Sequence, residues 1–168
     1  SVCSSDLIAL GKIATTLGMR GQQQVALRIC QEDVLPVFQQ LGDLRSMAII
    51  MGKIADLLQS EGQSREALRI LQEHELPVYE RLGDIRSKAI TMGQIAFILQ
   101  AQGQLREALR LLQEEVLPPL EHLGAKREVA ISKQKIAEIK AAMDQLHQTV
   151  ETPAEAENRA TLPANENT

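Results

Sequence analysis

Residues that could carry catalytic or metal chemistry are few in this chain, and their spacing does not group them. The run HELPV at residues 74–78 contains a His-Glu pair but lacks the second histidine with which a zinc-protease helix completes its metal site. Gly52-Lys53 lacks the upstream glycine and the following serine or threonine of a phosphate-binding loop. The sequence therefore predicts no catalytic residues, no metal site and no cofactor, and we expect the protein not to be an enzyme.

The carboxylates are interpreted as surface charge and not as an acid–base pair. Glu73, Glu75 and Glu80 are interpreted as one charged, solvated face of a helix. Arg69 lies four residues before Glu73, a spacing that allows a surface ion pair worth about 0.3–0.5 kcal/mol. Such pairs indicate support of a helix and not recognition of a ligand.

The composition excludes two classes of partner. A net charge of −4 and an aromatic content of 2% are unlike the basic, stacking surface that general nucleic-acid binding needs. No apolar run is long enough to cross a membrane, and the first residues do not form a signal peptide. Cys3 and Cys30 lack the CxxC spacing of a redox or zinc site, so we expect a reducing, cytoplasmic location.

The chain repeats itself at a step of 41 residues. Residues 42–82 and 83–123 are identical at 26 of their 41 positions, which indicates an array of structural repeats. The residues that keep the step are Gly11, Gly52 and Gly93; Gly21, Gly62 and Gly103; Gly42, Gly83 and Gly124; and Pro36, Pro77 and Pro118.

Each unit divides into two helices. In the unit that starts at Gly83, Asp84 is placed to cap the first helix, whose apolar residues recur at i, i+3, i+4 and i+7. Gly103 ends this helix, and Gly124 ends the second one. A helix pair with one apolar face cannot bury that face alone, whereas stacked pairs can, so the pattern predicts an all-α solenoid.

The units resemble the tetratricopeptide repeat (TPR), whose signature is a small residue, seven residues, glycine and then x-x-x-E-A-L. It occurs here as Ala55…Gly62-QSRE-Ala67-Leu68, as Ala96…Gly103-QLRE-Ala108-Leu109, and with Gln-Val before Ala26-Leu27 in the first unit. The resemblance covers residues 7–142 and implies a right-handed α-solenoid of about three and a half helix-turn-helix repeats. HEAT or armadillo repeats are the alternative, because their periods are nearer 41 residues than the usual TPR period of about 34. Long units of this type are similar to the arrays of bacterial multidomain signalling proteins, such as STAND ATPases, in which they act as sensors.

The repeat step divides the chain into residues 1–41, 42–82 and 83–123, then a capping helix at 124–143 and a disordered tail at 144–168. Lys133 and Lys140 stand in the capping helix where the preceding unit has Met92 and Leu99, so no further unit is expected to pack on that side. The tail is polar and aperiodic. The first helix has no comparable polar face. Either more repeats precede it, or the chain self-associates through Leu7 and Leu10.

The resemblance also implies a concave groove, formed by first-helix residues, that binds a peptide or helix of a partner protein. Thr15, Asp56 and Phe97 share one repeat position and differ in chemistry, as a determinant of specificity would, although neutral drift is an equal explanation. We therefore predict a non-catalytic protein-interaction module, with a structural scaffold that forms homo-oligomers as the alternative. The residues assigned to the groove are Lys12, Thr15, Lys53, Asp56, Gln59, Gln94, Phe97 and Gln100.

A proline interrupts each second helix. Pro77 lacks a backbone donor and clashes with the preceding turn, so the second helix is predicted to bend or break near residues 73–76. Because the same proline recurs in all three units, we interpret it as a geometric element that sets the curvature of the array.

Overall fold

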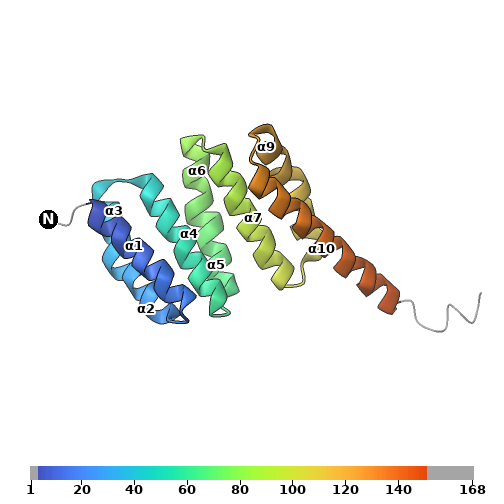
Figure 1. Cartoon of the computed structure of the whole chain (residues 1–168), viewed down its shortest axis with the longest axis horizontal. Coiled ribbons are helices and arrows are strands. Elements are labelled where there is room, and N and C mark those ends of the chain that lie inside the picture. Colours follow the sequence, from blue (N-terminus) through green and yellow to red (C-terminus); the bar gives the residue numbers. More distant parts are fainter. Residues whose placement is uncertain (1–3, 151–168) are drawn as a thin grey trace, which may run out of the picture.

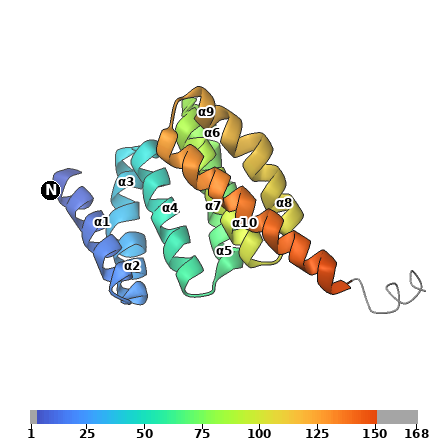
Figure 2. The same cartoon turned by 45° about the vertical axis from the view of Figure 1, so that its right-hand side comes forward.

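The computed structural model describes residues 4–150 and contains two layers of helices (Figures 1 and 2). The first helices of successive units are α1 (Ser4–Met19), α4 (Leu44–Ser60), α7 (Ile85–Ala101) and α10 (Lys126–Val150). Each second helix has three consecutive segments: α2 (Gln23–Arg28), η1 (Ile29–Val34) and α3 (Leu35–Leu41); α5 (Ser64–Ile70), η2 (Leu71–Glu75) and α6 (Leu76–Leu82); and α8 (Leu105–Arg110), η3 (Leu111–Val116) and α9 (Leu117–His122). The described residues contain no strand, and the predicted all-α solenoid is confirmed.

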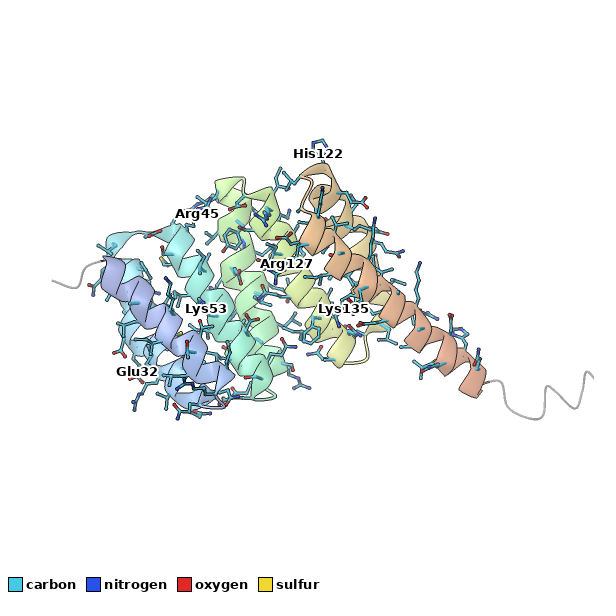
Figure 3. The ribbon with its side chains drawn as sticks, in the orientation of Figure 1. Glu32, Arg45, Lys53, His122, Arg127 and Lys135 are labelled. Carbon is cyan, nitrogen blue, oxygen red and sulfur yellow. The ribbon has the colours of Figure 1, made fainter. Side chains whose placement is uncertain are left out.

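Glycine and aspartate form the joints before α4 and α7, as predicted. Gly83 follows α6 in the left-handed conformation at φ 62°, which glycine adopts without steric cost. Asp84 then caps α7, because its Oδ1 accepts a hydrogen bond of 3.0 Å from the N–H of Ser87. This hydrogen bond, together with one from Arg45, holds the pKa of Asp84 below its usual value. Arg45 of α4 thereby connects two successive units at the edge of the molecule (Figure 3).

Each second helix passes through its proline without a break. A π-helical segment of five or six residues stops at Val34, Glu75 or Val116, and α-helix resumes at the leucine that precedes the proline. Backbone dihedrals stay helical throughout, with φ −81° and ψ −53° at Glu75. Of the predicted bend or break, a break is therefore wrong. The wider π-helical turn accommodates the proline, which has no N–H to donate, within a continuous helix.

The wider turns change the spacing of the buried residues. A regular α-helix repeats every 3.6 residues, whereas these second helices bury one side chain at every fourth position. The four-residue rows are Ala26, Cys30, Val34 and Phe38; Ala67, Leu71, Glu75 and Tyr79; and Ala108, Leu112, Val116 and Leu120, all at most 6% exposed. These rows pack against the first helices and form the core, and Cys30 is the small buried residue that its repeat position predicts.

The last first helix is longer than predicted. α10 continues to Val150, so residues 144–150, which the sequence analysis assigned to a disordered tail, are helical. The reason is Asp144, which stands where Gly103 turns the chain at φ 79° after α7. Without that glycine the helix runs on past the rest of the solenoid (Figure 1). Lys133 and Lys140 are exposed, as expected for a cap. The rest of the predicted tail lies outside the described residues.

The first helix of the array is only partly covered. Leu7 is 1% exposed and Leu10 is partly buried against the core, so Leu7 belongs to the fold and the prediction that it is free for self-association is wrong. Ile13 is instead 49% exposed. Its counterparts in the following units, Ile54 and Ile95, are 2% and 4% exposed, because there the second helix of a preceding unit covers them.

Two substitutions at this repeat position test the packing difference. Ile54→Ala is expected to lower the free energy of unfolding by about 2–5 kcal/mol, because it opens a cavity between two units. Ile13→Ala removes the same atoms from a half-exposed site and is expected to cost about 1 kcal/mol or less. Urea denaturation of both variants checks the comparison. Equal losses would show that Ile13 is covered in solution.

Candidate functional site

The candidate site is the exposed side of α1, α4, α7 and α10, here called the first-helix face. All eight residues assigned to the groove lie on these helices. Thr15, Asp56 and Phe97 take the same repeat position on α1, α4 and α7. Lys12 is exposed on α1, one turn before Thr15. Lys53 of α4 and Lys135 of α10 are labelled in Figure 3.

Side chains on this face pair from one unit to the next in one register. The Lys53 ammonium donates a hydrogen bond of 2.8 Å to the Thr15 hydroxyl of the preceding unit. Gln94 Nε2 donates to Asp56 Oδ1 at 2.9 Å in the same way. At the third junction, the Lys135 ammonium lies 5.4 Å from the centre of the Phe97 ring, a cation–π contact. The type of contact therefore changes at each junction, while the repeat positions that form it stay the same.

A groove of about 340 Å³ lies on the predicted face between α7 and α10 and is here called the large groove. Phe97, Ile90 and Ile131 line it and are 47%, 41% and 51% exposed. Val116 and Leu120 of the second helix form part of its lining. Asp56, Gln59, Gln94 and Gln100 also border this groove. The structure thus brings together five of the eight predicted residues.

A second groove of about 270 Å³, here called the small groove, lies between α1 and α4. Thr15, Lys53 and Asp56 border it, and Cys30 lies in its lining. Burial raises the pKa of the Cys30 thiol, which is the opposite of what a reactive thiol needs. Asp56 borders both grooves, so the two meet at this carboxylate. Lys12 lines neither groove.

The exposed isoleucines of the first-helix face were not among the residues predicted from the sequence. Ile49 on α4 is 46% exposed and occupies the same repeat position as Ile90 and Ile131. The recurrence of isoleucine at a step of 41 residues was a signal available in the sequence. The predicted groove residues were instead taken from positions that vary between units, and this position does not vary.

Glu75 is buried, contrary to the prediction. This last residue of η2 is 5% exposed and lies against α4 and α7, so its interpretation as part of a solvated face is wrong. The π-helical turn that ends at Glu75 rotates this position inward, where the other units have Val34 and Val116. Gly52 leaves the space: a Cβ there would lie 2.8 Å from Glu75 Oε2.

Burial acts on the pKa of Glu75 more strongly than its hydrogen bond does. The Thr91 hydroxyl lies 3.1 Å from Glu75 Oε1 and 3.0 Å from the Ser87 carbonyl oxygen, as a donor to these acceptors. Its hydrogen bond to Glu75 favours the carboxylate and opposes the rise in pKa. Glu75 Oε2 is buried and has no hydrogen-bond partner in the described structure. Burial is the main cause that raises the pKa of Glu75 to about 7, and the Asp56 charge adds to it.

Asp56 lies close enough to Glu75 for its charge to act on the buried carboxyl group. Its side chain is exposed, but neighbouring atoms of the two junctions partly desolvate the carboxylate and raise its pKa. The hydrogen bond from Gln94 and the charge of Lys53 oppose this effect. Within residues 4–150 neither Asp56 nor Glu75 takes part in an ion pair.

Substitution of Glu75 by valine, the residue of the other two units, is expected to change the pH dependence of stability. The folded state binds the Glu75 proton more tightly than the unfolded state, because the pKa rises from 4.5 to about 7 on folding. Stability is therefore lost as the pH rises from 4.5 to about 7, by on the order of 3 kcal/mol. Glu75→Val is expected to gain stability over wild type across this range, measured by denaturation at several pH values. Glu75→Gln, which does not titrate, is the control and should also lack this pH dependence; a constant difference between Glu75→Val and wild type would contradict the prediction.

Gly52 and Gly93 provide a matched pair of substitutions. Gly93→Ala places a Cβ 4.0 Å from Val116 Cγ1, which is an ordinary contact, so it is expected to stabilise the helix by up to about 1 kcal/mol. Gly52→Ala is expected to be less stable than Gly93→Ala, because its Cβ displaces the Glu75 carboxyl group. The double variant Gly52→Ala/Glu75→Val should recover the difference in urea denaturation. Equal stability of the two single variants would show that Glu75 does not occupy this space.

Comparisons with known proteins agree with this geometry. A family model described as tetratricopeptide repeat matches residues 89–114, which include the Gly103 and Ala108-Leu109 signature. No curated protein matches the chain. The crystal structure of Podosopora anserina putative kinesin light chain nearly identical TPR-like repeats superposes with a TM-score of 0.62 at 23% identity, covering 99% of this chain and 81% of that chain. A crystal structure of a variant of the same Podosopora anserina repeats gives 0.60 at 22% identity, covering 96% and 79%. The chain thus contains a tetratricopeptide repeat match at residues 89–114 within an α-solenoid that has the fold of TPR-like repeats.

Proposed function

We propose that the chain is a non-catalytic protein-interaction module whose first-helix face binds an extended segment or a helix of a partner protein. The observation that carries the proposal is the large groove, where Ile90, Phe97 and Ile131 expose apolar surface side by side. Exposed apolar side chains at the rim of a hollow are typical of interaction sites. A family of interaction repeats and a TPR-like fold support the same general function.

The groove has the size and lining of an anchor site. A volume of about 340 Å³ is at the lower end of ligand pockets and accommodates one or two apolar side chains of a partner. Amides and charges stand at its edge, among them Gln59, Gln100 and Glu128. The Gln100 Oε1 atom is buried without a hydrogen-bond partner among the described residues, and a backbone N–H of a bound segment would satisfy it.

Self-association is a second candidate, and one observation favours it. Ile13 is 49% exposed at a position that is covered in the next two units. A second copy could cover it by packing the two N-terminal faces together, because the opposite end carries Lys133 and Lys140. A strict monomer at high concentration in sedimentation would reject this candidate.

The wider setting rests on the resemblance of the long repeat units. On that basis we propose a cytoplasmic location within a bacterial multidomain signalling protein, where the array would sense a partner. The 41-residue unit and its joints support this assignment only as an analogy of fold.

Two exposed substitutions on the first-helix face test it as the binding surface. Ile90→Ser/Ile131→Ser is expected to reduce partner capture at least about tenfold, because both apolar rims of the large groove are lost. Capture is measured by quantitative mass spectrometry, with the chain as bait in extracts of the cells that produce it.

Val25→Ser is the matched control. Val25 is 40% exposed on the second helix α2, close to the 41% of Ile90. The control should capture the same proteins as wild type. Loss of capture with Val25→Ser and not with Ile90→Ser/Ile131→Ser would place binding on the second-helix layer and contradict the proposal.

A further inference from the structure

We propose that the junction between α4 and α7, where Asp56 borders both grooves above the buried Glu75, receives one lysine or arginine side chain of the partner segment. This inference rests on the proposed function, since it names the chemistry of the segment that the first-helix face binds. It commits to a basic side chain on the basis of complementary charge.

The repeat places Glu75 at a position whose counterpart in the next unit borders a groove. In the next unit Val116 lines the large groove together with Gly93 and Ser132. Glu75, Gly52 and Thr91 occupy the same three positions at the α4–α7 junction. A buried carboxyl group therefore stands where the neighbouring junction has a valine that borders a groove, and this carboxyl group fills the space that the missing side chain of Gly52 leaves.

Neither carboxyl group forms an ion pair with a described residue, although the charge of Lys53 acts on Asp56 and opposes the rise of its pKa. Glu75 is 5% exposed and its Oε2 is without a hydrogen-bond partner in the described structure. Lys53, the ammonium of α4 on this face, is directed to Thr15 of the preceding unit. Gln94 supplies Asp56 with a neutral donor only. Buried carboxylates are normally paired, so Glu75, which no described cation pairs, is complementary to a cation together with the nearby Asp56.

The position favours a long basic side chain carried by a segment that lies along the face. A segment that occupies the large and the small groove must pass Asp56, because both grooves border it. The exposed Ile49 and Ile90 lie on the same two helices, α4 and α7. The aliphatic stem of a lysine or arginine can pack on such apolar surface while its charged end reaches the carboxylates.

Ionisation of Glu75 links this binding to pH. When the site is empty, burial and Asp56 favour the protonated carboxyl group, whose pKa is raised to about 7. A bound cation reverses the balance and releases the proton. The other groups that face this position are Thr91 and Gln94 from α7, Lys53 from α4, and Tyr79 from α6. Burial is the main cause that raises the pKa of Tyr79 to about 12, and the charges of Glu75 and Asp84 add to it. Affinity for a basic segment should therefore fall as the pH drops below about 7.

A random linear peptide library displayed on phage tests the inference on the full chain. Peptides selected by wild type, and lost by Ile90→Ser/Ile131→Ser, are expected to carry lysine or arginine at a fixed distance from an apolar residue. A selected peptide is then compared with an analogue that has norleucine at the basic position. Wild type is expected to prefer the basic peptide by roughly tenfold or more at pH about 8, and by less at pH about 6.

Two protein variants are the controls. Glu75→Val/Thr91→Ile restores the Val34 and Ile50 pair of the first junction, which packs in this fold, and it is expected to lose most of the preference while still binding the analogue. Asp56→Asn, at an exposed site, should weaken the preference as well and serves if the double variant does not fold. Selected peptides without a basic residue, or an unchanged preference in both variants, would overturn the inference. Peptides that bind equally to Ile90→Ser/Ile131→Ser would instead overturn the proposed binding face.

Discussion

The missing N–H of one proline in each unit is the constraint on which the rest of the structure depends. An α-helix cannot place a proline in its interior without losing a hydrogen bond and meeting a steric clash. Each second helix responds with a π-helical segment that ends directly before the leucine preceding Pro36, Pro77 or Pro118. The wider turn spaces the buried residues four apart, and the last residue of each π segment then faces the neighbouring first helix. The interruption in the sequence is thus what fits the two layers of helices together.

Because every junction has this same geometry, side chains can change at one junction without a change of fold. Solenoid repeats contact mainly their neighbours, so a substitution acts locally. The residue that ends the π segment is valine in two units and Glu75 in the other. On the surface, one register position forms an ammonium–hydroxyl pair, an amide–carboxylate pair and a cation–π pair in turn. The scaffold is repetitive, and the junctions differ through side chains that border the two grooves.

The sequence alone was sufficient for the repeat, the helix pairs and their joints, because glycine in the left-handed conformation and aspartate at a helix start leave strong local signals. It was not sufficient where the spacing departed from 3.6 residues per turn. Glu75 was assigned to the solvent together with Glu73 because both are charged, although residues two apart on an α-helix lie on different sides. The four-residue row of Ala67, Leu71, Glu75 and Tyr79 was visible only through its apolar counterparts in the other units. The end of α10 was misplaced for a related reason: the repeat was extended to Asp144, although the glycine that turns the chain is absent there.

Glu75 has no role in stability that the other units do not fill with a smaller, apolar side chain. Valine at the same position packs at 0% and 2% exposure against the same kind of first helix, so the fold does not require a carboxyl group there. A buried, half-satisfied acid destabilises a folded chain, and the hydrogen bond from the Thr91 hydroxyl only lessens the effect. Drift on an exposed surface cannot explain a polar residue in this place, because the position is not exposed. A buried acid near Asp56, where the two grooves meet, therefore supports our proposal of a ligand at this junction, and the two neighbouring carboxyl groups favour a cation as that ligand.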